Sequence, residues 1–176
     1  MNIPKKLVLL VALLLTSCAS TQKKYTETTQ LDLAKVMGPW YVMAGRFTSL
    51  EKNVHNGIET YSWNTQEKRI DISFTYNKDS FTGEKVSFNH KAWVRDSMTQ
   101  AYWEFSPFWP LKFDYIFIDK ADDYSWVASG VPDQGYLWIL AKDHKLSHDK
   151  IRIILERIKA KGYDTSNIVF VPHQHN

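Results

Sequence analysis

The sequence predicts an all-β domain of eight antiparallel strands, followed by one α-helix and a short final strand. Hydrophobic and polar residues alternate with a period of two between residues 40 and 142. Turn-forming residues interrupt this alternation about every eight to twelve residues, which is typical of antiparallel sheets. After residue 142 the apolar spacing becomes helical. Eight short strands of this kind form either a closed barrel or a sandwich.

The predicted strands form one continuous unit, because no internal repeat or long linker divides them. They are expected at residues 40–48, 58–63, 69–76, 85–94, 100–106, 113–119, 124–129 and 136–142. The turns between them are expected at residues 64–67, 79–83, 96–97 and 132–135, where Asn, Asp, Ser and Gly favour tight backbone bends.

A single amphipathic helix is predicted after the eighth strand. Its apolar stripe consists of Ile151, Ile154, Leu155 and Ile158. Ser147 is a suitable N-cap and Gly162 a suitable C-terminal stop. Because only one face is apolar, the helix should pack on the outside of the β-structure. A short strand at residues 168–171 is expected to end the fold.

The N-terminus has the pattern of a secretory signal. Lys5 and Lys6 precede an apolar run at residues 7–15, and Leu-Thr-Ser-Cys follows, ending at Cys18. The run is far shorter than the roughly 20 residues that span a bilayer, which argues against an uncleaved anchor. This end resembles bacterial lipoproteins, in which the cysteine is acylated. The predicted organisation is a signal peptide at 1–17, a lipidated N-terminus and polar tether at 18–30, and one domain at 31–176.

Composition excludes several classes of protein. The formal charge of +3 includes Lys5 and Lys6, so the mature chain is nearly neutral and nucleic acid is not an expected partner. Cys18 is the only cysteine, so the domain must be stable without a disulfide. With 44% hydrophobic and 14% aromatic residues, the chain can form a substantial core.

Two motifs near the predicted first and sixth strands resemble the lipocalin family. Residues 38–41 have the sequence Gly-Pro-Trp-Tyr, similar to the Gly-x-Trp-Tyr signature of the first lipocalin strand. The strand at residues 113–119 ends at Asp119, similar to a lipocalin strand whose terminal Asp lies in a turn.

A third motif, around the seventh and eighth strands, indicates a subgroup. It comprises Tyr124-Ser125-Trp126, Gly130, Pro132 and residues 136–140. It resembles the bacterial lipocalins of the outer-membrane lipoprotein subgroup, which is also similar to apolipoprotein D and to plant temperature-induced lipocalins. The resemblance covers residues 31–172, and the three motifs occur in the family's order.

The resemblance implies an eight-stranded antiparallel up-and-down barrel with the helix packed outside. Gly38 would let a short helical turn enter the barrel, and Trp40 would plug the closed end. The family usually has Arg where this sequence has Lys142, which can cover Trp40 but lacks a planar guanidinium. Gly45 resembles an extra residue and predicts a β-bulge, so the sequence does not fix which later residues of the first strand face inward.

Alternate residues of such a barrel point inside, where one small ligand fits. In the family's register the inner residues are Ile58, Thr60, Ile72, Phe74, Tyr76, His90, Ala92, Trp103, Phe105, Ile116 and Trp138. This set suits an acyl chain, and the resemblance implies that a fatty acid or lysophospholipid is stored or transported in envelope lipid maintenance. His90 is either a head-group contact or a satisfied core histidine.

The alternative function is an envelope-anchored structural or protein-interaction module whose barrel is filled by its own side chains. Without the motifs, alternating aromatic residues would indicate a packed core. Trp103, Phe105 and Trp138 distinguish the two hypotheses, because they either line a cavity or interdigitate.

The sequence predicts no enzyme activity, no cofactor and no metal site. It has no Gly-x-Ser-x-Gly elbow, and its only cysteine is the predicted anchor. His173 and His175 would supply two metal ligands at most, whereas a catalytic zinc site needs three.

The predicted location is the periplasmic face of the outer membrane. Ala19 rather than Asp follows Cys18, which resembles lipoproteins sent to that membrane. The expected partners are a lipid ligand and, through acylated Cys18, the membrane. A homodimer is possible, but no residue pattern indicates one, so the sequence does not decide the oligomeric state.

Overall fold

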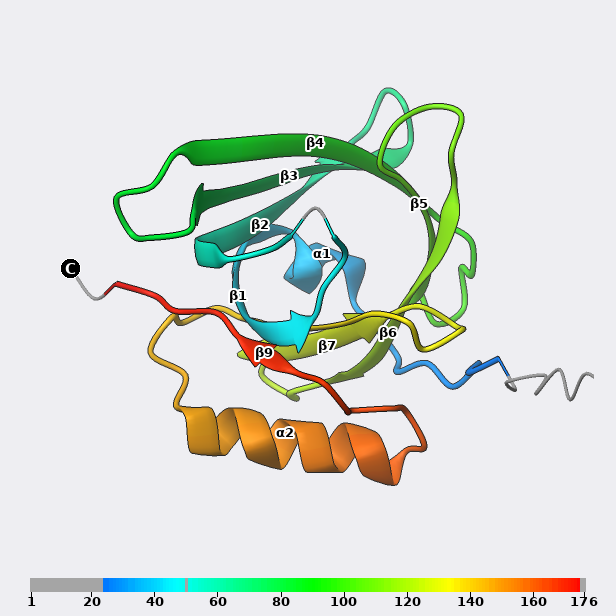
Figure 1. Ribbon diagram of the computed structural model, residues 1–176. Helices are drawn as coiled ribbons and strands as arrows, with labels where there is room; N and C mark the ends of the chain where they lie inside the picture. Colours follow the sequence, from blue (N-terminus) through cyan, green and yellow to red (C-terminus); the bar gives the residue numbers. More distant parts are fainter. Residues whose placement is uncertain (1–23, 50, 175–176) are drawn as a thin grey trace, which may run out of the picture.

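The computed structural model describes residues 24–49 and 51–174, and Figure 1 views it roughly along the barrel axis. The strands are β1 (Gly38–Arg46), β2 (Val54–Asn64), β3 (Arg69–Lys78), β4 (Lys85–Val94), β5 (Tyr102–Ser106), β6 (Phe113–Lys120), β7 (Trp126–Gly130), β8 (Leu137–Ala141) and β9 (Val169–Phe170). The helices are α1 (Leu33–Val36) and α2 (His148–Ala160). The predicted signal peptide and Cys18 lie outside the described residues.

Eight strands form a closed barrel. Each strand from β2 to β7 pairs with the next one antiparallel, and β1 pairs with both β8 and β2. The ninth strand lies outside, where Phe170 pairs with Ala44 and Val169 with Gly45 of β1. This arrangement confirms the predicted barrel, outer helix and short final strand. Among the described residues, no helix has the length and apolarity needed to cross a membrane.

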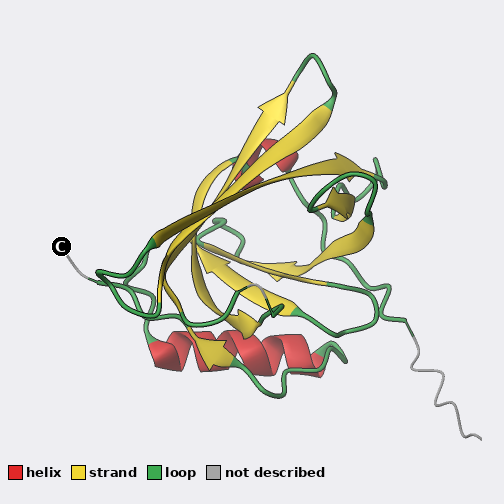
Figure 2. Ribbon diagram, turned by 45° about the horizontal axis from the view of Figure 1, so that its top comes forward, coloured by secondary structure: helices red, strands yellow, loops and turns green. Residues whose placement is uncertain are grey.

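Two hydrophobic clusters hold the domain together. One fills the barrel and includes Trp40, Tyr61, Trp103 and Phe117, all nearly inaccessible to solvent. The other lies between the barrel wall and the apolar stripe of α2, which rests along the outside of the barrel (Figure 2). Strands under α2, such as β6 and β8, are therefore buried on both faces, and their residues do not alternate between apolar and polar.

Helix α2 is held by its caps and by a buried acid. The Ser147 hydroxyl accepts a hydrogen bond from the Lys150 amide at 3.2 Å and so caps the first turn. The Asp119 carboxylate is 2% exposed and lies 2.6 Å from Arg157 Nε and 3.1 Å from Lys161 Nζ. The acid at the end of β6 thus fastens the last turns of the helix to the barrel.

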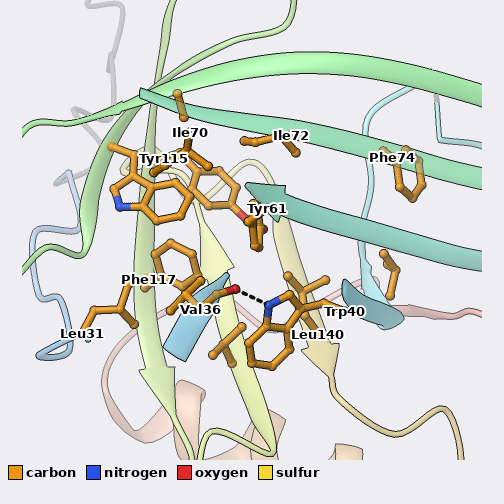
Figure 3. Packing of buried hydrophobic residues seen from close by; sticks show 14 of the residues in the cluster. Leu31, Val36, Trp40, Tyr61, Ile70, Ile72, Phe74, Tyr115, Phe117 and Leu140 are labelled. Atoms are coloured by element: carbon orange, nitrogen blue, oxygen red, sulfur yellow. Dashed lines mark hydrogen bonds between the residues drawn. The ribbon is translucent and has the colours of Figure 1, made fainter. Parts of the chain in front are cut away.

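The closed end is formed by α1 and the first residues of β1 (Figure 3). Trp40 Nε1 donates a hydrogen bond to the Val36 carbonyl oxygen at 2.6 Å. Lys142 Nζ lies 3.7 Å from the centroid of the Trp40 ring and 3.3 Å from the carbonyl oxygen of Met37. Gly38 has φ +96°, a conformation that suits glycine, where the chain turns from α1 into the barrel.

Bulges in β1 and β2 correct part of the predicted register. In β1 the pairing shifts between Val42 and Ala44, which places the irregularity before Gly45. Gly45 is needed for space, because a Cβ atom there would lie 2.3 Å from the Leu137 carbonyl oxygen. In β2 the pairing shifts between His55 and Ile58. The strand begins at Val54, earlier than predicted, because this bulge breaks the alternation.

The seam beside these bulges is covered by the C-terminal segment. The Val171 amide donates to the Met43 carbonyl oxygen at 2.9 Å, and the Asn56 amide donates to the Pro172 carbonyl oxygen at 3.0 Å. His173 Nε2 lies 2.9 Å from the Val42 carbonyl oxygen. The pairing of β1 with β2 ends at Tyr41 and Ile58, and backbone groups of both strands beyond that point find partners in this segment.

Residues 24–30, assigned to a mobile tether by the sequence, lie against the barrel. The Tyr25 ring is buried edge-to-face on Tyr163, with ring centroids 5.0 Å apart. The Tyr25 amide donates to the Pro132 carbonyl oxygen at 2.7 Å, and the Thr29 amide donates to the Phe117 carbonyl oxygen at 3.1 Å. The buried Tyr25 ring and these backbone hydrogen bonds dock the segment, which composition alone did not indicate.

Candidate ligand-binding site

A cavity of about 730 Å³ lies inside the barrel and opens at the end opposite α1. We call this open end the mouth. It is formed by the loops between β1 and β2, β5 and β6, and β7 and β8. The lining residues of the barrel wall are Val42, Glu59, Phe74, Phe88, His90, Phe105, Phe113, Asp114, Tyr115 and Trp138. The lining residues outside the strands are Lys24, Thr48, Ser49, Glu51, Pro107, Phe108, Leu111, Lys112, Val131, Pro132, Asp133 and Tyr136.

Aromatic rings from successive strands form a band around the cavity. The ring centroids of His90 and Phe105 are 5.0 Å apart, and those of Phe105 and Tyr115 are 6.0 Å apart. Tyr115 in turn lies 5.7 Å from Trp138 of β8, two strands further along the sheet. The band leaves a hollow of the size that small-molecule sites have.

The structure separates the predicted inner residues into three groups. Phe74, His90, Phe105 and Trp138 line the cavity. Ile72, Tyr76, Ala92 and Trp103 belong to the cluster that fills the barrel and do not line the cavity. Ile58, Thr60 and Ile116 do not face the interior, and their prediction as calyx residues is wrong.

The errors at Ile58 and Thr60 come from the bulge in β2. After the pairing shift, Glu59 pairs with Phe74 and Tyr61 pairs with Ile72, so these residues face the interior. Ile58 and Thr60 then alternate to the outer face. The extra residue changes the phase of the strand by one position, which moves every later side chain to the other face.

Ile116 was misplaced because β6 is buried on both faces. Trp103 pairs with Tyr115, and residues directly opposite each other in a ladder share a face. Tyr115 therefore faces inward with Trp103. Ile116 packs in the outer cluster with Ile154 of α2. An unbroken apolar strand gives no signal of which residues face inward.

Glu59 and Glu51 are polar residues of the cavity that the sequence analysis missed. Burial, reinforced by the charge of Glu51, raises the pKa of Glu59 to about 8. Glu51 Oε1 accepts a hydrogen bond from Trp138 Nε1 at 3.0 Å. Glu51 Oε2 accepts hydrogen bonds from the Thr48 amide at 3.1 Å and the Thr48 hydroxyl at 2.8 Å.

Different sequence signals could have identified the other residues of the cavity wall that the sequence analysis missed. Phe88 is two positions before His90, so extending the alternation of β4 would have identified it. Tyr115 could have been found by pairing β6 with Trp103 across the ladder. No sequence signal marks Glu51, which comes from a loop.

Two tyrosines and a serine form a hydrogen-bonded group on the inner wall. The hydroxyls of Tyr61 and Tyr115 lie 3.1 Å apart, and the Tyr115 hydroxyl donates to Ser129 Oγ at 2.6 Å. Tyr61 also hydrogen-bonds Glu59. Burial raises the pKa of both phenols well above the usual range, so they stay protonated.

His90 is a neutral group of the wall. Its Nδ1 atom lies 3.3 Å from the Pro107 carbonyl oxygen, which can only accept the hydrogen bond. Burial lowers the pKa of His90, so the ring is uncharged at pH 7. Within residues 24–49 and 51–174, no three His, Cys, Asp or Glu side chains gather in a metal-binding arrangement.

The mouth exposes large apolar side chains. Trp109 is 78% exposed, Phe108 62%, Phe113 52% and Leu111 43%. We call these four residues the mouth patch. They belong to one segment that spans the loop between β5 and β6 and the start of β6. An apolar patch beside a cavity is a common mark of a functional surface.

Comparison with known proteins gives the family. A family model of the lipocalin-like domain matches residues 31–173. Insecticyanin of the tobacco hornworm Manduca sexta has the same fold, with a TM-score of 0.64 and 13% identity over 86% of this chain and 85% of that one. Lobster apocrustacyanin has a TM-score of 0.61 and 13% identity over 81% of this chain and 79% of that one. The chain belongs to the lipocalin family.

Sequence relatives place it more narrowly. The outer membrane lipoprotein Blc of Vibrio cholerae is 22% identical over 168 residues, covering 95% of this chain and 97% of that protein. Blc of Escherichia coli is 26% identical over 162 residues, covering 91% of this chain and 90% of that protein. Temperature-induced lipocalin-1 of Arabidopsis thaliana is 24% identical over 161 residues, covering 86% of this chain and 85% of that protein. Within the lipocalins, the chain groups with the bacterial Blc subgroup.

Proposed function

We propose that this lipocalin binds a single-chain lipid, a fatty acid or a lysophospholipid, and stores or transports it in the cell envelope. The open cavity is the observation that carries the proposal. Of the three aromatic residues that distinguish the hypotheses, Phe105 and Trp138 line it, whereas Trp103 packs in the cluster that fills the rest of the barrel. Burying about ten methylenes among such rings contributes roughly 8 kcal/mol before ordering costs. Micromolar affinity is therefore expected.

The proposed lipid anchor would hold the mouth close to a membrane. Lys24 lines the cavity at the mouth, and Cys18 precedes it by six residues. Six residues span about 20 Å at most. Acylation of Cys18 would thus keep the opening within that distance of the bilayer surface, which we propose to be the periplasmic face of the outer membrane.

The mouth patch supports uptake of lipid directly from that surface. Indole rings such as that of Trp109 favour the membrane interface, where an apolar ring meets polar head groups. Lys112, three residues later in the chain, pairs with Glu104 and also brings a positive charge to the mouth that suits anionic phosphates. A ligand leaving the bilayer would then enter the calyx without crossing water.

The experiment is lipid extraction and titration on unacylated protein that starts at Ala19. Native mass spectrometry identifies any co-purified lipid, and tryptophan fluorescence follows titration with a lysophospholipid and a fatty acid. Phe88→Glu places a charge in the cavity wall and should abolish saturable binding. Trp63→Phe is the matched control, because Trp63 is outside the cavity and 43% exposed. Absence of both co-purified lipid and saturation would favour the alternative of an envelope-anchored interaction module.

A further inference from the structure

The calyx interior carries two acids without basic partners. Glu59 projects from β2, and Glu51 enters from the loop between β1 and β2. Within the described part of the chain, no Lys or Arg forms an ion pair with either carboxyl group. Their contacts are uncharged groups, the Tyr61 hydroxyl for Glu59 and the Trp138 indole and Thr48 for Glu51.

The cations that line the cavity are already paired. Lys24 Nζ lies 3.5 Å from Asp114 Oδ2, and Lys112 Nζ lies 2.6 Å from Glu104 Oε1. His90 is uncharged at pH 7, because burial lowers its pKa. The basic groups of the wall therefore leave the Glu51 carboxylate unneutralised, and Glu59, with a pKa of about 8, adds a second negative charge once it loses its proton. Such an interior repels an anionic group and attracts a cation.

The aromatic band adds a second attraction for a cation. The rings of Phe105, Tyr115 and Trp138 surround the same hollow as the two carboxyl groups. Ring faces attract an ammonium group within about 6 Å, most strongly when water is excluded. Carboxylates and aromatic faces around one cavity together form a complementary environment for an ammonium ion.

We propose that the calyx binds a hydrophobic cation, with its ammonium group between Glu51 and Glu59 and its apolar chain among the aromatic rings. This proposal rests on the calyx being a ligand site, as proposed above. It adds a second class of ligand, whose positively charged head group lies inside the calyx. A lipid with an anionic head group would instead keep that group at the mouth. The ammonium group is the positively charged partner that the ion pairs described above do not provide for the two acids.

The test compares three probes that share a twelve-carbon chain. Dodecyltrimethylammonium is the cation, dodecyldimethylamine N-oxide is a nearly isosteric neutral probe at pH 7, and dodecanoate is the anion. Below their micellar concentrations, the cation should bind at least about tenfold more tightly than the amine oxide, as a desolvated cation–π contact and a carboxylate allow. Dodecanoate should bind more weakly than either.

Variants assign the preference to the two acids. Glu59→Gln and Glu51→Gln should each reduce the preference for the cation to about threefold or less, because Glu51 supplies a carboxylate and Glu59 supplies a second one when it loses its proton in the field of the bound cation. Asp122→Asn removes a carboxylate from the turn between β6 and β7, outside the cavity, and should leave the preference unchanged. A preference that survives both glutamine substitutions would overturn the proposal.

The pH dependence gives an independent readout. A bound cation favours the ionised form of Glu59, so the affinity for dodecyltrimethylammonium should rise between pH 6 and about pH 8 and then level off. Of the groups that face Glu59, Tyr61 and Tyr115 have raised pKa values and stay protonated throughout this range. Burial lowers the pKa of His90, so its ring is uncharged from pH 7 upward. Calorimetry in buffers of different ionisation enthalpy should detect proton release at pH 7.

The outcomes separate the two proposals. If the amine oxide and dodecanoate bind as tightly as the cation, the calyx remains a lipid site and the cation preference is refuted. If the cation affinity does not change with pH, Glu59 is not its partner and the proposal fails in this form. If none of the three probes binds, both proposals fail together.

Discussion

Replacing Asp119 by Asn should loosen helix α2 from the barrel. The carboxylate is buried and bonds Arg157 and Lys161, with further support from the Lys120 amide at 3.0 Å. Removing one partner of a buried pair costs about 3–5 kcal/mol. The Arg157 side chain is 53% exposed, so the freed cation reaches water and the cost is lower. We expect Asp119→Asn to reduce the free energy of unfolding by about 2–3 kcal/mol.

The assay is urea unfolding followed by circular dichroism, with thermal melting as a second measure. For a domain of this size, the loss corresponds to a melting temperature lower by about 4–12 °C. Asp149→Asn is the control, because its pair with Arg152 lies on the exposed face of α2 and should contribute less than about 0.5 kcal/mol. A double-mutant cycle with Arg157→Gln should give a coupling above about 1 kcal/mol. A coupling near zero would refute the reasoning.

Three further predictions concern stability. Gly45→Ala should destabilise by about 1–3 kcal/mol, because its Cβ would meet the Leu137 carbonyl oxygen. Urea unfolding checks this, and an unchanged midpoint would contradict the close approach. Lys142→Met should cost about 1 kcal/mol by removing the cation from the Trp40 ring, whereas Lys142→Arg should retain it. Glu59 binds its proton more tightly when folded, so the unfolded state loses that proton first as pH rises. The free energy of unfolding should therefore fall between about pH 5 and pH 8, by at most about 1.4 kcal/mol per pH unit, and Glu59→Gln should flatten that slope.

Elements with one buried face could be predicted closely from the sequence. In β3 the buried residues Ile70, Ile72, Phe74 and Tyr76 alternate with more exposed ones, so both the strand and its inner face follow from the pattern. Helix α2 shows a single apolar stripe and a Ser147 cap for the same reason. The motif residues Gly38 and Trp40 lie together at the closed end, as the family resemblance implied.

The candidate site was predictable only where this alternation continued without interruption. Phe74 and His90 lie on such strands and line the cavity. The bulge after His55 shifts the phase of β2, so Glu59 rather than Ile58 reaches the interior. A bulge depends on backbone pairing with a distant strand, which no local pattern contains. The position of Glu51 depends on the path of a loop over the mouth. No local sequence pattern contains that path, so this residue could not be predicted either.

The seam covered by residues 171–174 affects the order in which the chain can fold. Strand β1 lies near the beginning of the domain, yet it needs β8 and β9 from the end of the sequence as neighbours. Pairings between such distant segments form slowly, because the intervening chain must first be ordered. The barrel therefore cannot close until β8 is present, and β9 can cover β1 only after that. For a chain exported through a narrow translocation channel, as the N-terminus predicts, this dependence delays closure until the C-terminal strands have crossed.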